Sequence, residues 1–174
     1  MKPFDFCPAC ATRLDWDRGE GGTCPGCGRT WYRNSAPTAG AAIVHEGRAL
    51  VTQRAIEPHK GRWDVPGGFL SAGEDPIEGL RRELREELGI EVDVTADDCV
   101  SLVTHEYGPE GDFVLALGFL ARLRSGDPKA ADDVAAFLWI EPAELETLEF
   151  AWEHDRELVR KALKRAEEDG DGRS

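Results

Sequence analysis

The sequence predicts an α+β fold, in which helices flank a mixed β-sheet and a small cysteine-rich module precedes them. Three observations support this class. Apolar stretches of strand length are separated by turn residues along much of the chain. A helix with strong three-and-four periodicity starts near residue 76, and two Cys-X-X-Cys pairs stand near the N-terminus. Because strands and helices do not alternate strictly, a mixed sheet is favoured over a purely parallel one.

Size and charge restrict the function. The chain has 174 residues, which suits a small module followed by one medium domain. Its net charge is −13 and no Lys/Arg-rich run is present, which argues against electrostatic binding to nucleic acid as a function. An acidic enzyme that acts on phosphates would need metal ions as its positive charge. Since no long apolar stretch or signal-peptide pattern occurs, we expect a cytoplasmic protein without a membrane partner.

Residues 1–34 are predicted to form a zinc ribbon. Cys7 and Cys10 form one pair, and Cys24 and Cys27 form a second pair after a spacer of 13 residues. Each pair can present two thiolates from a tight turn, so the four together complete a closed tetrahedral Zn²⁺ site. Two disulfides are the alternative, which a reducing compartment disfavours. A closed site leaves no open coordination position, so we expect this zinc to be structural.

The role of the ribbon stays open between a nucleic-acid reader, an oligomerisation module and part of a substrate wall. Its acidic first loop, with Asp15, Asp17 and Glu20, argues against the first. Tyr32 could stack on a base, although an aromatic residue at this place is more often a packing residue. Asn34–Pro37 is predicted to be the linker to a second domain at 37–168, and residues 169–174 to be a flexible tail.

The second domain is predicted to combine several strands with flanking helices. Apolar patterns predict strands at 38–44, 49–54, 63–65, 91–94, 100–106, 112–123 and 134–140. A short helix is expected at 142–148 and a longer one at 151–168. Cys99 is most simply a buried small residue. His59 and His154 are interpreted as surface or packing residues.

The stretch 68–90 contains the helix on which the functional hypothesis rests. Asp75 with Glu78 is typical of a capping box, Pro76 occupies the favoured first helical position, and Gly89 can end the helix in a left-handed turn. The apolar stripe of this helix consists of Ile77, Leu80, Leu84 and Leu88. At about 100° per residue, Glu83, Glu86 and Glu87 share another face.

Three crowded carboxylates repel one another, and a divalent cation removes that penalty. Hard oxygen ligands of this kind suit Mg²⁺ or Mn²⁺. The alternative is a solvated helix face that pairs with Arg81, Arg82 and Arg85. Spacing alone leaves these two interpretations level.

A family resemblance favours the metal. Gly68, Glu74 and the run Arg82–Ile90 stand at every fixed position of the Nudix box, and Trp63–Gly68 resembles the strand and turn that precede it. The sequence is similar to a Nudix domain over about residues 37–165. The resemblance implies an α/β/α sandwich that hydrolyses a diphosphate linkage in a nucleoside diphosphate derivative, such as ADP-ribose, a dinucleotide or a nucleotide sugar. Sanitation of nucleoside triphosphates is the alternative, and a homodimer is plausible on this resemblance.

The resemblance also assigns roles within the box. Glu83 and Glu87 correspond to the main metal ligands, Glu86 to a shared or bridging ligand, and the carbonyl of Gly67 to a further ligand. Glu74 and Arg82 correspond to supporting residues that hold these carboxylates. A later acid usually acts as ligand or general base, and here Asp133, Glu106 and Glu110 are the alternatives.

Substrate specificity is less well indicated. A zinc ribbon before a Nudix domain, with a tyrosine near Tyr32, resembles the NADH pyrophosphatases. The stretch Ser101–Pro109 does not match their aromatic- and proline-rich signature, so NADH is not the expected substrate. His105 and Tyr107 could line the pocket or be structural. A ligand-sensing or nucleic-acid-binding module that borrowed the fold is the non-enzymatic alternative, but such a module would be expected to lose box carboxylates.

Overall fold

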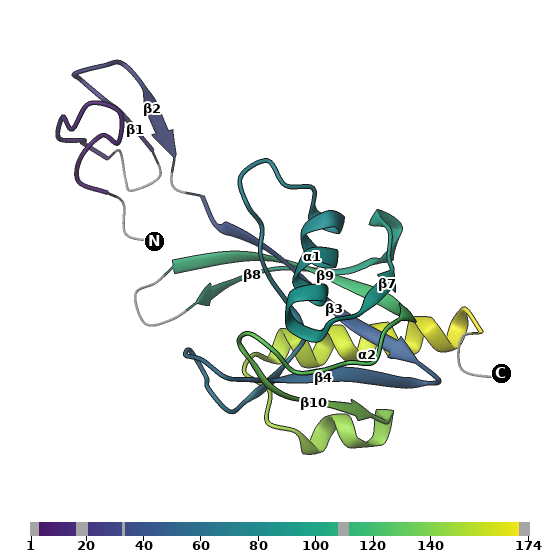
Figure 1. Cartoon of the computed structure of the whole chain (residues 1–174). Helices are drawn as coiled ribbons and strands as arrows, with labels where there is room; N and C mark the ends of the chain where they lie inside the picture. The colour runs from purple at the N-terminus through teal and green to yellow at the C-terminus, as the bar shows by residue number, and fades with distance from the viewer. Residues whose placement is uncertain (1–3, 17–20, 33, 108–111, 171–174) are drawn as a thin grey trace. The chain divides into compact units, whose positions relative to one another are not determined.

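The computed structural model describes residues 4–16, 21–32, 34–107 and 112–170 (Figure 1). The chain divides into two compact units. Unit 1 comprises Met1–Ala36 together with Thr104–Val114, and unit 2 comprises Pro37–Val103 together with Leu115–Ser174. The first division falls within the predicted linker. Residues 171–174 of the predicted tail lie outside the described residues.

Unit 1 contains a two-stranded ribbon with a small core. Strand β1 (Gly21–Thr23) pairs antiparallel with β2 (Thr30–Tyr32). The core consists of Cys7, Leu14 and Cys24, packed against Phe4, Trp16 and Trp31. The Phe4 ring lies edge-on to both tryptophans, with centroids 5.2 and 5.7 Å apart. A core this small does not supply enough apolar burial to stabilise a fold by itself.

Unit 2 is built on an eight-stranded sheet with the order β10-β4-β3-β9-β7, in which β5 pairs with β4, β6 with β3 and β8 with β9. The strands are β3 (Ala36–His45), β4 (Arg48–Arg54), β5 (Trp63–Asp64), β6 (Gly67–Phe69), β7 (Glu91–Asp93), β8 (Cys99–Tyr107), β9 (Asp112–Ser125) and β10 (Val134–Ile140). The two α-helices are α1 (Pro76–Leu88) and α2 (Glu153–Glu168), and short 3₁₀ helices are η1 (Ala96–Asp98) and η2 (Pro142–Thr147).

The two α-helices cover opposite faces of this sheet. Successive side chains of a strand point to opposite faces. In β3, Ala41 and Ile43 pack with Leu80 and Leu84 of α1. The intervening Ala42 and Val44 pack with α2 residues, which are Leu158, Val159, Ala162, Leu163 and Ala166. The predicted α/β/α sandwich is therefore confirmed (Figure 1).

The ends of α1 follow the sequence closely. The Asp75 carboxylate accepts from the backbone amides of Ile77 and Glu78 (2.9 and 3.3 Å), and Gly89 ends the helix at φ 68°. The expected capping box is incomplete, because the Glu78 carboxylate accepts from Arg81 (2.7 Å) instead of returning to Asp75. The helix start is thus held by one side chain and an i,i+3 ion pair.

Three other expectations differ from the structure. The short helix predicted at 142–148 is the 3₁₀ helix η2, and α2 starts at Glu153 rather than near residue 151. The delay has a visible cause. Trp63 donates to the carbonyl of Glu149 (3.0 Å) and accepts from the amide of Ala151 (2.7 Å), so the residues before α2 pair with a strand. Gly67 and Gly68, expected in the turn before the helix, lie in strand β6 (Gly67–Phe69).

Candidate functional site

Arg82 gathers the more accessible carboxylates of the site on one side of α1. It donates to both oxygens of Glu74 (2.8 and 3.0 Å), to Glu83 (2.8 Å) and to Glu86 (3.0 Å). The two bonds from Arg82 to Glu74, together with the backbone amide of Ser71, lower the pKa of Glu74 to about 2. Bidentate contact of this kind fixes both partners geometrically. Glu74 and Glu83 are therefore held in defined positions.

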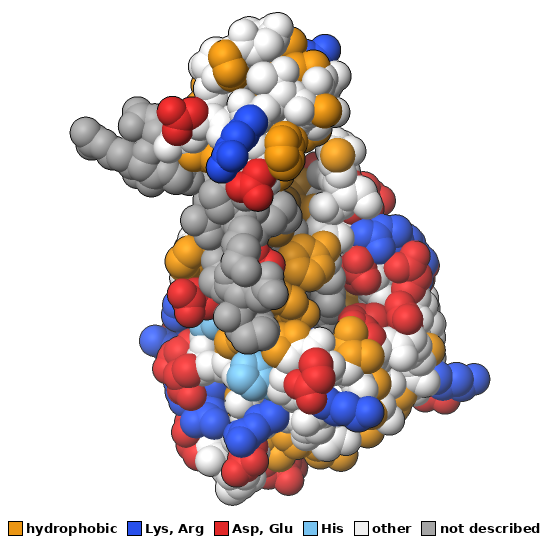
Figure 2. All heavy atoms as spheres, turned by 90° about the vertical axis from the view of Figure 1, so that its left-hand side faces the viewer, with side chains coloured by type: hydrophobic (Ala, Val, Ile, Leu, Met, Phe, Trp, Pro, Cys, Tyr) orange, Lys and Arg blue, Asp and Glu red, His pale blue; other side chains and the backbone are white. Residues whose placement is uncertain are grey.

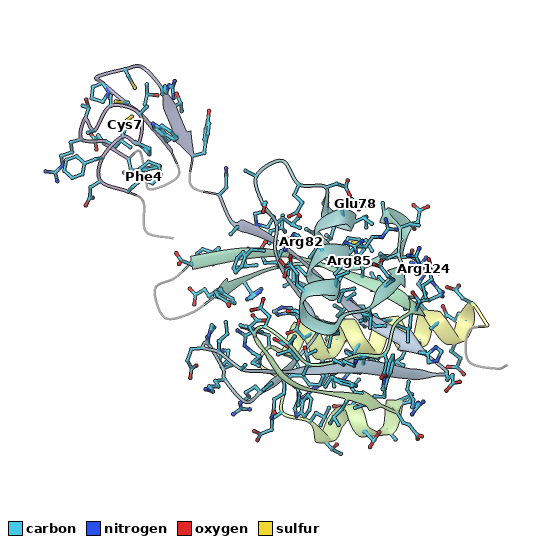
Figure 3. All side chains as sticks on the ribbon, viewed as in Figure 1. Phe4, Cys7, Glu78, Arg82, Arg85 and Arg124 are labelled. Carbon is cyan, nitrogen blue, oxygen red and sulfur yellow. The ribbon has the colours of Figure 1, made fainter. Side chains whose placement is uncertain are left out.

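Arg85 of α1 makes a different set of ion pairs from Arg82. Figure 3 shows Arg85 on the side of α1 that faces Arg124, away from Arg82. Arg85 donates to Glu91 (2.7 Å), and Arg124 donates to the second oxygen of Glu91 (3.4 Å). These ion pairs join the helix to β7 and β9. Arg85 therefore pairs with a residue outside the box, whereas Arg82 pairs with the box carboxylates Glu83 and Glu86.

Glu87 lies in a different environment from its neighbours. Its side chain is buried, with 4% exposed, and one carboxylate oxygen accepts from the amide of Gly67 (2.9 Å). Burial raises the pKa of Glu87 well above its ordinary value, and the negative charges of Asp133, Asp64 and Glu83 raise it further. An isolated buried carboxylate is costly unless a cation compensates it. This donor is therefore of the kind that a divalent ion stabilises.

Asp133, which lies far from α1 in the sequence, lines the same cavity as Glu87. Asp64, Gly67, Glu87 and Asp133 line one small cavity of about 20 Å³ in unit 2. The amide of Ala55 donates to the Asp133 carbonyl (2.7 Å), and that of Ala131 to the Glu87 carbonyl (2.9 Å). These bonds tie the segment before β10 to both β4 and the end of α1. The charge of Asp133 raises the pKa of Glu83 as well as that of Glu87.

Gly68 leaves space for Glu83. A Cβ atom at Gly68 would lie 2.5 Å from the Glu83 carboxyl carbon and 2.6 Å from one of its oxygens. Real Cβ contacts are not that short, so the Glu83 carboxylate occupies a place that only glycine leaves open. Burial raises the pKa of Glu83, and hydrogen bonds from Arg82 oppose this effect. Glu83, Glu87 and Asp133 thus present hard oxygen donors of the type that bind Mg²⁺ or Mn²⁺.

Thr52, Arg54 and Asp64 also line this cavity, and none of them was singled out from the sequence as a site residue. Thr52 donates to one oxygen of Asp64 (2.7 Å), and Arg54 donates to the other (2.8 Å). Burial raises the pKa of Asp64, and these two donors partly counteract the increase. One signal was present in the sequence. Thr52 and Arg54 are polar residues two apart at the end of an apolar strand, so they share one face.

The remaining expected site residues are not among the described residues that line this cavity. Tyr32, His105 and Tyr107 belong to unit 1, whereas the carboxylates belong to unit 2. Tyr32 is 68% exposed, and a His105 ring nitrogen contacts the carbonyl of Glu106 (2.9 Å). Glu106 is exposed in β8, and Glu110 lies outside the described residues. Substrate contacts by these side chains stay predictions.

The residues that we expected to be structural behave accordingly. His59 packs edge-on against Trp152, with centroids 5.2 Å apart. His154 is mostly buried, with its Nε2 3.4 Å from Asp155. Cys99 is half-buried rather than fully buried, and it packs against the core beneath α1.

The four N-terminal cysteines converge as predicted. Their sulfur atoms all lie within 4.8 Å of one another, and Figure 3 shows the sulfur atoms gathered near Cys7. The Sγ–Sγ distances are 3.7 Å for Cys7–Cys27 and 3.5 Å for Cys10–Cys24. All five cysteines are free, and these distances greatly exceed a disulfide bond of about 2 Å. The disulfide alternative is therefore wrong.

The local backbone explains how the cysteines converge. The amides of Ala11 and Gly28 donate to the carbonyls of Cys7 and Cys24 (2.8 and 2.9 Å). Ala11 and Gly28 have left-handed φ angles of 56° and 73°, so the two turns have matching conformations. Burial opposes ionisation of the Cys7 thiol, but hydrogen bonds from the Ala9 and Cys10 backbone help to lower its pKa to about 6. Thiolate is the form that binds metal.

Among the described residues, a second cavity is lined by none of the expected site residues. A larger cavity of about 660 Å³ lies beside the C-terminal half of α2, with Val44, Leu145 and Leu163 in its wall. On the face shown in Figure 2, acidic and basic side chains are interspersed, without a continuous basic field over the described residues. No helix in the described part of the chain is long and apolar enough to cross a membrane.

Comparison with known proteins adds independent information. A family model described as the NUDIX domain matches residues 34–162. A relative from Mycobacterium tuberculosis, named as a candidate 8-oxo-dGTP diphosphatase, is 38% identical over 119 residues, which cover 67% of this chain and 80% of the relative. An ADP-ribose pyrophosphatase from Methanocaldococcus jannaschii is 30% identical over 105 residues, covering 59% of each chain.

A solved structure resembles the whole fold. The crystal structure of a NUDIX hydrolase from Nitrosomonas europaea superposes with a TM-score of 0.71 and covers 95% of this chain and 93% of its own. The two sequences are 20% identical, so this likeness concerns the fold alone.

Proposed function

Because this chain belongs to the Nudix family, we propose that it hydrolyses a diphosphate linkage in a nucleotide derivative, with Mg²⁺ or Mn²⁺ as the catalytic ion. The observation that carries this proposal is the buried Glu87 carboxylate, which shares a cavity with Asp133 and is electrostatically coupled to Glu83. Nudix hydrolases generally use these two ions. The hard, acidic oxygen donors present here fit them.

The chain's own residues divide the work as follows. Glu83 and Glu87 would hold the ion, with Glu86 as a further ligand that Arg82 now engages. The Gly67 carbonyl remains the proposed backbone ligand. Arg82 and Glu74 hold the Glu83 carboxylate in place through the ion pairs described above. When bound, the ion neutralises the diphosphate and lowers the pKa of a water molecule.

We assign the later acidic role to Asp133. It lines the same cavity as Glu87, and its charge raises the pKa of both Glu83 and Glu87. Its carboxylate can accept a proton from water or complete the ligand set. Asp133→Asn separates these uses. Loss of a base would lower kcat and flatten its acidic pH limb at unchanged Mn²⁺ affinity, whereas loss of a ligand would weaken Mn²⁺ binding.

Two substrate classes are supported by different observations. The leading class is a nucleoside diphosphate derivative, such as ADP-ribose, supported by the N-terminal cysteine module and the similarity to the M. jannaschii pyrophosphatase. The second is an oxidised purine nucleoside triphosphate, which the more similar M. tuberculosis relative favours. Both require attack of water on a phosphorus atom of a diphosphate, so the same carboxylates serve either reaction.

The decisive experiment is a hydrolysis panel with Mg²⁺ and Mn²⁺. It contains ADP-ribose, NADH, NAD⁺, a nucleotide sugar and 8-oxo-dGTP, and it includes Glu87→Gln as the control. We expect turnover of one class and a fall in kcat of at least about 100-fold in Glu87→Gln, on the scale of losing one electrostatic stabiliser. The mutant should keep its fold, because Gln can still accept from Gly67. Turnover that persists in the mutant would contradict the metal assignment.

We further propose that Cys7, Cys10, Cys24 and Cys27 bind one structural Zn²⁺. In a regular tetrahedron with Zn–S distances of about 2.3 Å, the sulfur atoms would be about 3.8 Å apart. The two measured pairs, at 3.5 and 3.7 Å, fit that spacing. Dimerisation stays a prediction, which light scattering of the purified chain would test.

A further inference from the structure

Arg54, the last residue of β4, connects three segments around the carboxylate cavity. Its Nε donates to the carbonyl of Pro58 (2.6 Å), and its Nη1 donates to Asp64 in β5 (2.8 Å). Its guanidinium group stacks over the ring of Trp152, 4.9 Å from the centroid. The side chain is only 11% exposed. A planar guanidinium that is bonded at its edge and stacked on its face has little freedom to move.

Arg54 also controls the charge and orientation of Asp64. Both Asp64 oxygens are engaged, one by Arg54 and the other by Thr52 (2.7 Å). The Asp64 side chain is 13% exposed, so solvent cannot easily replace either donor. Each oxygen of Asp64 therefore accepts a hydrogen bond from a fixed donor, and these two bonds hold the orientation of the carboxylate.

The location of Asp64 makes this restraint consequential. Asp64, Glu87 and Asp133 line the same cavity. Among the described residues of that lining, Arg54 is the cation. Without its guanidinium group, the Asp64 carboxylate would be an additional free oxygen donor beside the proposed metal ligands. A divalent ion could then bind the Asp64 carboxylate as an additional, negatively charged ligand, and its coordination would differ from the one proposed.

We propose that Arg54 is a positioning residue that binds Asp64 and keeps this carboxylate out of the coordination sphere of the catalytic ion. The inference rests on the proposed function, because it presupposes a divalent ion at Glu87. It assigns Asp64 an opposite role to the neighbouring acids. Glu87 is a proposed ligand of the ion and Asp133 a proposed ligand or general base, whereas Asp64 is held away from the ion.

The first test compares Mn²⁺ affinity and turnover in Arg54→Ala. Electron paramagnetic resonance counts free Mn²⁺, so affinity is measured without any substrate. We expect tighter Mn²⁺ binding, by several-fold, and a kcat lowered by about 10- to 100-fold, which is the usual size of the effect of residues around a metal site that do not bind the ion. A purely structural role would instead weaken Mn²⁺ binding together with thermal stability. Unchanged or weaker Mn²⁺ binding would overturn the inference.

The second test asks whether Asp64 transmits the effect. In Arg54→Ala/Asp64→Asn the competing charge is absent, and an amide still fills the position. We expect Mn²⁺ affinity to return toward the wild-type value and part of kcat to be recovered. A double variant that is no more active than Arg54→Ala would refute the inference.

Two further variants keep the test decisive if Arg54→Ala does not fold. Arg54→Lys retains the charge but cannot reach both Pro58 and Asp64 while stacking on Trp152. Thr52→Val removes only the second restraint on Asp64. Each of these variants should bind Mn²⁺ more tightly and have a lower kcat than the wild type, with smaller changes than in Arg54→Ala. Adding Asp64→Asn to either variant should bring both values back toward those of the wild type. Wild-type protein and Glu87→Gln, measured in parallel, show whether the proposed function itself is wrong. If the wild type neither binds Mn²⁺ nor turns over the panel, the proposed function falls, and the inference falls with it.

Discussion

Glycine is required at the adjacent positions 67 and 68 for different reasons. Gly67 has a φ of 141°, and a Cβ atom there would lie 2.2 Å from the backbone oxygen of Ala39. That oxygen belongs to a strand and cannot yield. A Cβ at Gly68 would meet only the end of the Glu83 side chain, which can rotate away. Gly67 is therefore needed for the backbone packing of the fold, and Gly68 is needed for the position of Glu83 in the site.

This difference gives a prediction for single residues. Gly67→Ala should destabilise the protein by more than about 1 kcal/mol, because alanine is incompatible with the native backbone there. Gly68→Ala should change stability much less but lower kcat strongly, since Glu83 must leave its position beside Arg82. Urea unfolding and steady-state kinetics of both variants provide the check. Equal losses of stability in the two variants would show that Gly68 is structural as well.

Among the elements, helix α2 is unusual because it buries an acidic residue in its first turn. Asp155 is 6% exposed, with His154 3.4 Å away. Burial raises the pKa of Asp155 well above its ordinary value, the charge of Asp64 adds to this, and Arg54 opposes it. The N-terminal end of a helix favours negative charge, but the desolvation cost is larger here.

The sign of the resulting pH dependence follows from linkage. Because the pKa of Asp155 is raised in the native state, that state holds a proton which the unfolded chain has already released. The stability from this group is complete below its ordinary pKa of 3.8 and is lost as the pH rises through the raised value. One such proton changes the free energy of unfolding by at most about 1.4 kcal/mol per pH unit.

Asp155→Asn should therefore reduce the loss of stability between pH 4 and the raised pKa. Urea unfolding in a chelator at successive pH values measures the slope for both proteins. Glu153→Gln is the matched control, since it removes an exposed carboxylate from the same turn. If Asp155→Asn and the wild type have parallel pH profiles, Asp155 does not exchange its proton on unfolding.

At the scale of the whole molecule, the two compact units depend on different sources of stability. Unit 2 has an apolar core on each face of its sheet. Unit 1 has a core of three buried residues with three aromatic neighbours. Structural zinc sites commonly contribute on the order of 10 kcal/mol or more, which a core of that size does not replace.

Removal of zinc should consequently unfold the N-terminal module and spare the sheet of unit 2. We expect one zinc per chain by elemental analysis, and rapid proteolysis within residues 1–34 after treatment with a strong chelator. The main thermal transition should stay within a few degrees of its original temperature. Cys24→Ser should reproduce the effect without a chelator. A module that resists protease when zinc-free would contradict the structural assignment.

The sequence alone determined those features that depend on neighbouring residues. The α1 helix, its Asp75 and Gly89 ends and its carboxylate face follow from a spacing of 3.6 residues. The two cysteine turns are equally local. The seven predicted strands match the structure to within two residues at each end. Strands β1, β2 and β6 were not predicted, and both β6 and the residues before α2 pair with strands far away in the chain.

The tertiary structure decided which acids meet. Asp64 and Thr52 are opposite each other because β5 pairs with β4, and Val134 is opposite Arg54 because β10 pairs with β4 from the other side. That pairing brings Asp133 to Glu87 and Arg54 to Asp64. Sequence periodicity reports which face of an element a residue occupies. It does not report which elements become neighbours, because the free energy that selects strand partners comes from contacts between residues far apart in the chain.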